Sequence, residues 1–188
     1  MILLIDNYDG CSNNIYQLAG QFDPDIRIVR NDRITPAAVW EAAPSHIILS
    51  GGSALPELAG NTIEIVQALA GRIPMLGICL GYRVLCAAYG AACAQMEPIR
   101  QGQSLPVEVT GKSPLFAGVP DRFYAGFYHS LTVPVSQIPK EFDVVATCCG
   151  EAAAIAHKTD AVFGVQFHPE SFLSEYGGRI MENFLHRP

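Results

Sequence analysis

A cysteine stands between two glycines in the segment Gly77-Ile-Cys79-Leu-Gly81. The apolar run from Ile73 to Ile78 predicts a buried strand, and the apolar spacing that follows predicts a helix. A Gly-x-Cys-x-Gly turn between a strand and a helix is typical of a nucleophile elbow, in which glycines remove Cβ atoms that would clash. The dipole and free N–H groups at the helix N-terminus favour thiolate over thiol. Cys79 is therefore a candidate nucleophile, and a buried core cysteine is the alternative.

A histidine and a glutamate follow a second apolar run, Val162 to Phe167, near the C-terminus. His168 and Glu170 are two residues apart at the end of a predicted strand, so their side chains point the same way. Pro169 between them fixes φ and restricts the loop. We expect the carboxylate of Glu170 to orient the imidazole and to stabilise its protonated form. Alone, this motif favours a surface turn. Combined with Cys79 it predicts a Cys-His-Glu triad for nucleophilic catalysis.

The composition indicates one globular domain, residues 1–188, of the α/β class. Of the 188 residues, 49% are hydrophobic and only 16% are charged, which suits a sizeable core. The net charge of −6, with no cluster of Lys and Arg, argues against nucleic acid or an anionic membrane as partner. No apolar run approaches the roughly 20 residues of a membrane span. The N-terminus lacks the basic start of a signal peptide, so we expect a cytoplasmic protein.

The cysteines show no spacing typical of a metal site or of a redox pair. There are six, at positions Cys11, Cys79, Cys86, Cys93, Cys148 and Cys149. None forms a C-x-x-C motif or a zinc-ligand pattern. Nothing else points to secretion, so we expect reduced thiols rather than disulfides.

Strands and helices alternate along the first half of the chain, which predicts an open, mostly parallel sheet flanked by helices. Ser12 is expected to cap the first helix, and Thr35 followed by Pro36 is expected to begin the second. From Ala91 to Val109 the pattern shifts to short strands, punctuated at residues 101–104. More strands are expected at 144–149, 152–157 and 162–167.

Two motifs together resemble the class I (triad) glutamine amidotransferases: Gly77-Ile-Cys79-Leu-Gly81 and Gly164-Val-Gln-Phe-His168-Pro-Glu170-Ser171. The start, Ile2-Leu-Leu-Ile-Asp-Asn-Tyr-Asp9, and the segment Tyr128-His-Ser-Leu131 resemble one branch of that family. This branch is the small (component II) subunit of anthranilate synthase and of aminodeoxychorismate synthase. The resemblance runs the length of the chain in the right order. It implies a flavodoxin-like fold with an extra antiparallel β portion.

The resemblance also implies an activity, the hydrolysis of L-glutamine through a thioester on Cys79. The backbone N–H groups of Gly52 and Leu80 would form the oxyanion hole. His168 would be the catalytic base, in preference to His129, and Glu170 would orient it. No metal and no organic cofactor would be required.

Substrate binding is carried over to three positions. Ser130 and Leu131 match the segment whose backbone holds the α-amino and α-carboxylate groups of glutamine. Arg83 replaces a glutamine of the family that contacts the substrate. Its permanent charge would pair with the substrate carboxylate, stabilise the Cys79 thiolate or fill the pocket.

Two further segments depart from the family pattern. Gly51-Gly52-Ser53-Ala54 replaces a Pro-Gly-Pro-Gly run, which makes the loop more mobile at its start and more restricted at Ala54. A phosphate-binding loop is the competing interpretation, but the lysine and spacing of that motif are missing. In the N-terminal turn, Gly10-Cys11-Ser12 replaces Ser-Phe-Thr.

The chain has no second motif set for using ammonia, so the resemblance implies a partner, a separate synthase subunit that uses chorismate. The sequence does not separate an anthranilate synthase from an aminodeoxychorismate synthase. Two alternatives remain open. One is a catalytically weak or silent homologue with a binding or regulatory role, and the other is a hydrolase of other γ-glutamyl compounds. Arg83 and Ala54 favour the silent homologue, whereas the intact Cys79, His168 and Glu170 argue against it.

Overall fold

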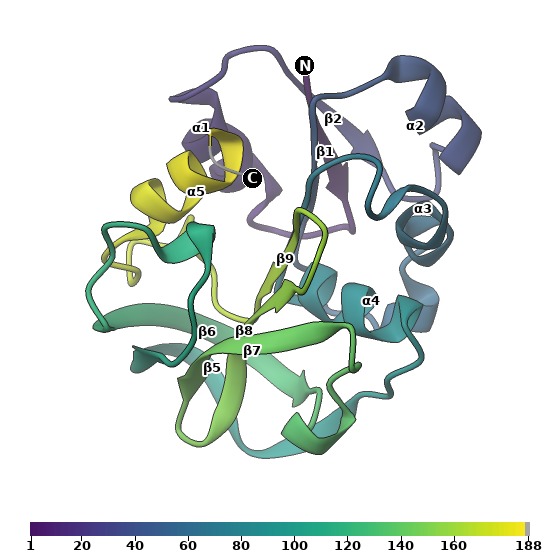
Figure 1. Ribbon diagram of the computed structural model, residues 1–188. Coiled ribbons are helices and arrows are strands. Elements are labelled where there is room, and N and C mark those ends of the chain that lie inside the picture. Colours follow the sequence, from purple (N-terminus) through teal and green to yellow (C-terminus); the bar gives the residue numbers. More distant parts are fainter. Residues whose placement is uncertain (187–188) are drawn as a thin grey trace.

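The computed structural model describes residues 1–186. Within this range one sheet separates two groups of helices (Figure 1). The strands are β1 (Ile2–Asp6), β2 (Ile26–Arg30), β3 (His46–Leu49), β4 (Met75–Ile78), β5 (Ala94–Val109), β6 (Arg122–Thr132), β7 (Phe142–Cys148), β8 (Glu151–His157) and β9 (Val162–Val165). The α-helices are α1 (Ser12–Gly20), α2 (Pro36–Ala42), α3 (Thr62–Leu69), α4 (Leu80–Ala88) and α5 (Gly177–His186).

The first half of the sheet is parallel, with the order β2-β1-β3-β4-β9. Alternate residues of β1 face opposite sides, as the pleat of a strand requires. Ile2 and Leu4 pack into one core with α1 and α5, whereas Leu3 and Ile5 pack into a second core with α2, α3 and α4. Both faces of β1, β3, β4 and β9 are covered, which explains why these four strands are mainly apolar, whereas the edge strand β2 is partly exposed along its length.

The second half is antiparallel and continues the same sheet in the order β9-β8-β7-β5-β6. The expected α/β fold with an extra antiparallel portion is thus confirmed. The short strands expected between residues 91 and 109 are wrong, because β5 is one strand of 16 residues. Its pairing with β6 shifts register between Gln95 and Arg100 and again between Gln101 and Gln103. These irregularities let the strand continue through residues 101–104, where the sequence suggested a break.

The starts of the first two helices differ in how well the sequence predicts them. At α2 the prediction is confirmed, because Thr35 accepts a hydrogen bond from the N–H of Ala38 at 3.3 Å. At α1 it is wrong: Ser12 is the first helical residue and Cys11 takes the cap position. The Ser12 hydroxyl instead donates to Asp6 at 2.7 Å. The loop after β1 is therefore tied to the strand rather than to the helix end.

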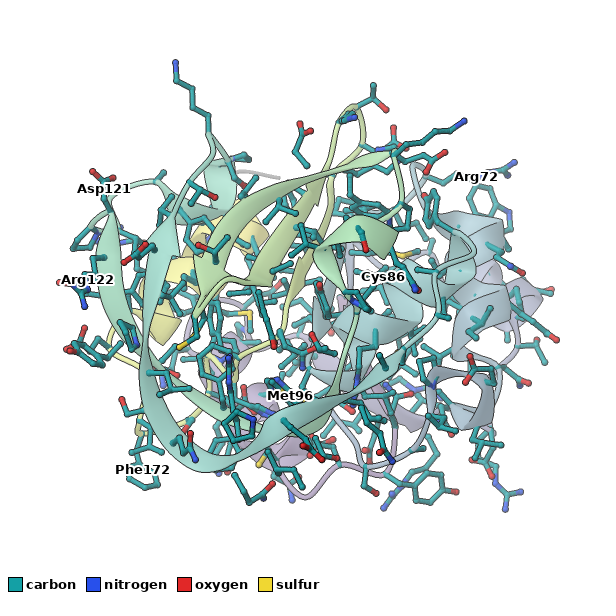
Figure 2. The ribbon with its side chains drawn as sticks, turned by 90° about the horizontal axis from the view of Figure 1, so that it is seen from below. Arg72, Cys86, Met96, Asp121, Arg122 and Phe172 are labelled. Carbon is teal, nitrogen blue, oxygen red and sulfur yellow. The ribbon has the colours of Figure 1, made fainter. Side chains whose placement is uncertain are left out.

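The carboxyl ends of the parallel strands meet at one edge of the sheet, where ligands bind in open α/β folds. Residues 7–11 follow β1, residues 50–54 follow β3, Cys79 follows β4 and residues 166–170 follow β9. Seen from below, Phe172 projects from the margin beyond this last loop (Figure 2) and is 92% exposed. In residues 1–186 no helix has both the length and the apolar character needed to cross a membrane.

Candidate active site

Cys79 lies between β4 and α4 in a strained backbone turn. Its φ of 53° and ψ of −99° place a non-glycine residue at positive φ, a conformation that costs on the order of 1–3 kcal/mol and that gathers at functional sites. Its N–H donates to the carbonyl of Val165 on β9 at 2.8 Å, and its carbonyl accepts from the N–H of Arg83 at 3.2 Å. The turn is therefore held from both sides, with the thiol at the N-terminus of α4.

The two glycines of the elbow are required by close packing. A Cβ on Gly77 would lie 2.5 Å from the backbone of Gly81, and a Cβ on Gly81 would collide with the carbonyl oxygen of Leu49. The N–H of Gly81 also donates to the carbonyl of Ser50 at 3.1 Å. The helix thus starts directly against the loop that follows β3, which supports the elbow predicted from the sequence.

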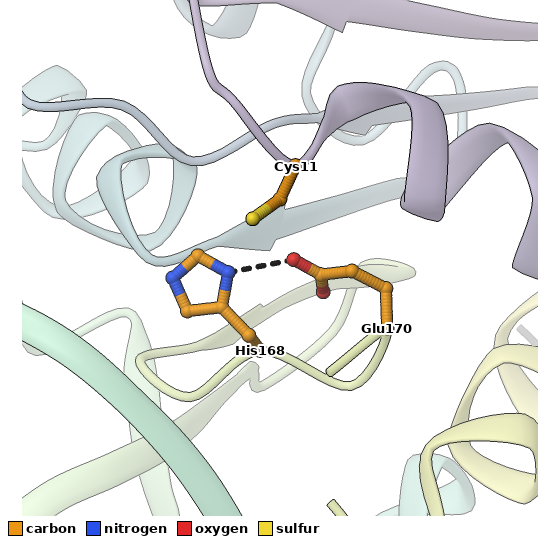
Figure 3. Close-up of side chains that lie close together, drawn as sticks. All are labelled: Cys11, His168 and Glu170. Carbon is orange, nitrogen blue, oxygen red and sulfur yellow. Dashed lines mark hydrogen bonds and ion pairs between the residues drawn. The ribbon is translucent and has the colours of Figure 1, made fainter. Parts of the chain in front are cut away.

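His168 and Glu170 form the pair expected from their spacing. Nδ1 of His168 lies 2.6 Å from Oε1 of Glu170 (Figure 3). Both side chains are almost fully buried, with 5% and 1% of their surface exposed. The backbone of His168 is fixed independently, since its N–H donates to Gly126 at 2.9 Å and its carbonyl accepts from the Ser174 hydroxyl at 2.6 Å.

The electrostatics of His168 favour its protonated form. Burial by itself would lower the pKa of His168, but the neighbouring Cys79 thiol and the Glu170 carboxylate raise the pKa well above its ordinary value. Nδ1 is already paired with Glu170, and Nε2 has no partner of standard hydrogen-bond geometry among the described residues. Nε2 is therefore the free atom of a ring that is oriented by a carboxylate.

His129 is a poor candidate for the same role. Burial, followed by the charges of Arg83 and Arg100, lowers the pKa of His129 to about 3. Its two ring nitrogens are buried, and neither has a hydrogen-bond partner within residues 1–186. The ring lacks the carboxylate that would orient it, which supports the choice of His168 from the sequence.

The two predicted oxyanion donors, Gly52 and Leu80, lie beside each other at the Cys79 elbow. Leu80 is the first residue of α4, where the helix leaves an N–H without an internal partner. Gly52 lies in the loop after β3, and a Cβ there would lie 2.7 Å from the carbonyl oxygen of Asn7 and 2.8 Å from Cδ2 of Leu80. Because glycine has no Cβ, the loop can approach the elbow this closely. Gly52 therefore lies next to Leu80, the first residue of α4.

Arg83 is a buried cation without an acidic partner in the part of the chain that the structure describes. Only 3% of the residue is exposed, yet its contacts are long. Nη2 lies 3.4 Å from the carbonyl oxygen of Gly52 and Nη1 lies 3.5 Å from that of Leu131. Nε is buried with no partner in residues 1–186. A charge held this loosely inside a cavity is available to an anionic ligand.

One cavity of about 360 Å³ connects these groups, a size typical of small-molecule sites. Among the residues that line it are Gly52, Cys79, Arg83, Ser130, Leu131 and His168. Leu80 and Glu170 do not line it but contact residues that do. The structure thus brings the predicted site residues together from four separate parts of the chain. Arg83 forms part of the wall and leaves the cavity open.

Sequence reasoning missed one residue that contacts the nucleophile. Nε2 of Gln166 lies 3.7 Å from Sγ of Cys79, and only 2% of Gln166 is exposed. The pairing of Ile78 with Val165 places the next residue of each strand side by side. Gln166 is a polar residue inside the apolar run 162–167, and this was the signal in the sequence that could have identified it as a site residue.

Comparison with known proteins gives one family model and several relatives that span this chain. The model of the family described as glutamine amidotransferase class-I matches residues 3–187. The chain is 38% identical to aminodeoxychorismate synthase component 2 of Escherichia coli over the full length of both. It is 36% identical to aminodeoxychorismate/anthranilate synthase component 2 of Bacillus subtilis, covering 98% of this chain and 95% of that one.

Two more similarities extend the comparison. The chain is 39% identical to the bifunctional protein TrpGD of Thermotoga maritima over 98% of its own length, but it spans only 32% of that longer protein. Among solved structures, a glutamine amidotransferase of Thermotoga maritima superposes with a TM-score of 0.74. That match covers 90% of this chain and 75% of the other at 21% identity, which bears on the fold alone.

Proposed function

The chain belongs to the class I glutamine amidotransferases, and from this premise we propose that it hydrolyses L-glutamine and delivers ammonia to a separate chorismate-using synthase. We also propose that residues 1–188 form a single amidotransferase domain. The observation that carries the proposal is the His168–Glu170 pair at 2.6 Å, beside the cavity that the Cys79 elbow and Arg83 line.

In this proposal the Cys79 thiolate attacks the side-chain carbonyl carbon of glutamine. The N–H groups of Gly52 and Leu80 donate to the developing oxyanion, and one such donor is worth about 2.7–4 kcal/mol of barrier in comparable enzymes. His168, protonated at Nε2, gives its proton to the departing ammonia. The products of this half-reaction are ammonia and a γ-glutamyl thioester on Cys79.

The second half-reaction returns the enzyme to its starting state. His168 takes a proton from a water molecule, which attacks the thioester and releases glutamate from Cys79. Glu170 accepts the Nδ1–H bond throughout, so Nε2 faces the reacting atoms in both steps. The buried, carboxylate-paired imidazole supports this role because its pKa is raised.

Arg83, Ser130 and Leu131 would hold the amino-acid end of glutamine. The guanidinium has no carboxylate partner in residues 1–186, and the α-carboxylate of glutamine supplies one. The backbone of Ser130 and Leu131 lies across the same cavity. The open cavity favours an active enzyme over a silent binding subunit, because Arg83 does not fill it.

The acceptor of ammonia is proposed from the relatives, whose names pair component 2 with aminodeoxychorismate or anthranilate synthase. Both acceptors would receive the same ammonia, so the geometry of this site does not favour one of them. We expect glutamine turnover to rise when the matching synthase subunit is added.

The test is covalent labelling with a glutamine analogue that carries an electrophile at the δ-carbon. Intact mass should show one adduct on the protein and none on a Cys79→Ser control. Glutamate release with each candidate synthase then identifies the partner. The absence of any adduct, even with synthase present, would contradict the proposed activity and favour a binding subunit. Turnover of other γ-glutamyl compounds without a partner would favour a hydrolase.

A further inference from the structure

A second thiol, in addition to that of Cys79, lies beside the His168–Glu170 pair. Cys11 comes from the opposite end of the chain, at the start of α1, and its Sγ points toward the two side chains (Figure 3). One ligand atom from each of Cys11, His168 and Glu170 lies within 4.8 Å of the other two. Sulfur, imidazole nitrogen and carboxylate oxygen are the ligand types that Zn²⁺ prefers.

Two carboxylates beside this cluster each have a buried oxygen without a hydrogen-bond partner in the described residues. Oε2 of Glu170 has no hydrogen-bond partner in the described residues, although the side chain is only 1% exposed. Oδ2 of Asp9 is also buried and unpartnered within the same range. A Cβ on Gly51 would lie 2.7 Å from that oxygen and 3.1 Å from Cε1 of His168, so Asp9 borders the same space. Unpaired buried carboxylate oxygens are costly, and a cation would satisfy them.

We propose that Cys11, His168 and Glu170 form a binding site for a soft divalent cation such as Zn²⁺, and that its occupation blocks the catalytic pair. This site goes beyond the proposed amidotransferase reaction, in which no step uses a metal. The spacing of the cysteines along the sequence does not indicate this site, because its three residues stand at positions 11, 168 and 170.

The geometry requires only small movements. Tetrahedral Zn²⁺ holds neighbouring nitrogen and oxygen ligands about 3.3 Å apart and sulfur slightly farther. Nδ1 of His168 and Oε1 of Glu170 would separate from 2.6 Å to admit the ion, and Sγ of Cys11 would move inward. Cys11 forms no disulfide within residues 1–186, so no covalent bond holds its sulfur in place.

Occupation has a chemical consequence for His168. The metal replaces the proton on Nδ1 and takes the place of the Glu170 hydrogen bond. The imidazole then loses the carboxylate that orients it, and its Nε2 is no longer a base tuned for proton transfer. Zn²⁺ would thus inhibit glutamine hydrolysis without contacting the glutamine cavity wall at Arg83.

The first experiment measures Zn²⁺ binding to the whole chain by competition with a chromophoric chelator. We expect one ion per chain, and a loss of affinity on the order of a hundredfold in Cys11→Ser, since one of three protein ligands is removed. Cys149→Ser is the matched control, because Cys149 is an exposed thiol outside the cavity. Co²⁺ should show a thiolate charge-transfer band that Cys11→Ser lacks.

A Cys79→Ser variant locates the ion. We expect this variant to retain Zn²⁺, because the catalytic thiol is not in the cluster. Three results would overturn the proposal. The first is Zn²⁺ binding that is unaltered in Cys11→Ser, and the second is no Zn²⁺ binding to the parent protein. The third is loss of Zn²⁺ binding in Cys79→Ser or in Cys149→Ser but not in Cys11→Ser. Binding is measured without turnover, so this result stands apart from the success or failure of the proposed glutaminase activity. Where turnover is present, Zn²⁺ should inhibit the parent and spare Cys11→Ser.

Discussion

Nη2 of Arg83 lies 3.4 Å from the carbonyl oxygen of Gly52. The altered residue Arg83 therefore contacts the altered loop 51–54, at the one loop position, Gly52, that still matches the amidotransferase pattern. Arg83 stands one helical turn after Cys79, and Gly52 belongs to the loop that replaces Pro-Gly-Pro-Gly. The arginine contacts the carbonyl oxygen of Gly52 and not its N–H. The N–H of Gly52 therefore stays available to the proposed oxyanion. The altered loop and the altered helix residue are thus parts of one arrangement.

Arg83→Gln tests whether the arginine binds substrate. We expect KM for glutamine to rise by about 10- to 100-fold with a smaller change in kcat, because a charge-assisted bond of roughly 1.5–3 kcal/mol is lost. Steady-state glutamate release with the partner synthase is the measurement. Arg72→Gln, which changes an exposed arginine outside the cavity, is the control. An improvement in kcat/KM would mean that the arginine obstructs the pocket.

Gly52→Ala tests the proposed oxyanion hole. The added Cβ would lie 2.7 Å from the Asn7 carbonyl oxygen, so the loop must shift and its N–H must leave its position. We expect kcat to fall on the order of 100-fold or more, the cost of one lost donor. Gly20→Ala is the matched control, because nothing lies within 4 Å of a Cβ at that residue. Turnover equal to the parent's in Gly52→Ala would exclude this N–H as a donor.

The sequence predicted an element well where its pattern of apolar and polar residues matches the burial of those residues in the fold. The inner parallel strands β1, β3, β4 and β9 are mainly apolar because both of their faces are covered. The Cys79 elbow is predictable because glycines flank it where a strand changes to a helix. His168 and Glu170 were predictable as a pair, since a spacing of two at a strand end fixes their relative direction.

What escaped prediction depends on pairing between distant segments. The punctuation at residues 101–104 suggested a break, but pairing with β6 carries β5 through it as bulges. Cys11 approaches His168 and Glu170 only because β1 and β9 end at the same edge of the sheet. Strand order is a property of the whole sheet and is not contained in local residue spacing, so contacts of this kind do not follow from the sequence pattern.

Gln166→Leu tests one contact of this kind. The amide Nε2 donates to the Cys79 sulfur at 3.7 Å, and a leucine of similar size removes the donor without opening a cavity. We expect the rate of Cys79 alkylation by iodoacetamide at neutral pH to fall by about tenfold or more, because a hydrogen bond to a charged group is worth roughly 1.5–3 kcal/mol. Gln67→Leu, on the surface of α3, is the control. An unchanged alkylation rate would assign Gln166 to packing alone.

Glu170→Gln tests the electrostatic role of the carboxylate through the pH dependence of stability. The pKa of His168 is raised on folding, against the effect of burial, by Cys79 and Glu170. A group whose pKa is raised on folding stabilises the protein below its unfolded pKa, about 6.5 for histidine, and that contribution disappears as pH rises through the folded value. Without the carboxylate the folded pKa of His168 should fall. The difference in Tm between the parent and Glu170→Gln should therefore be largest near about pH 6 and should shrink at higher pH.

Thermal unfolding of both proteins across this range gives the measurement, with Glu64→Gln on the exposed face of α3 as control. The control should track the parent at every pH, because Glu64 has no imidazole partner among residues 1–186. A Tm difference that grows as pH rises would mean that Glu170 stabilises the neutral ring instead. In that case the carboxylate would not support a protonated His168, and the proposed protonation of departing ammonia would need another donor.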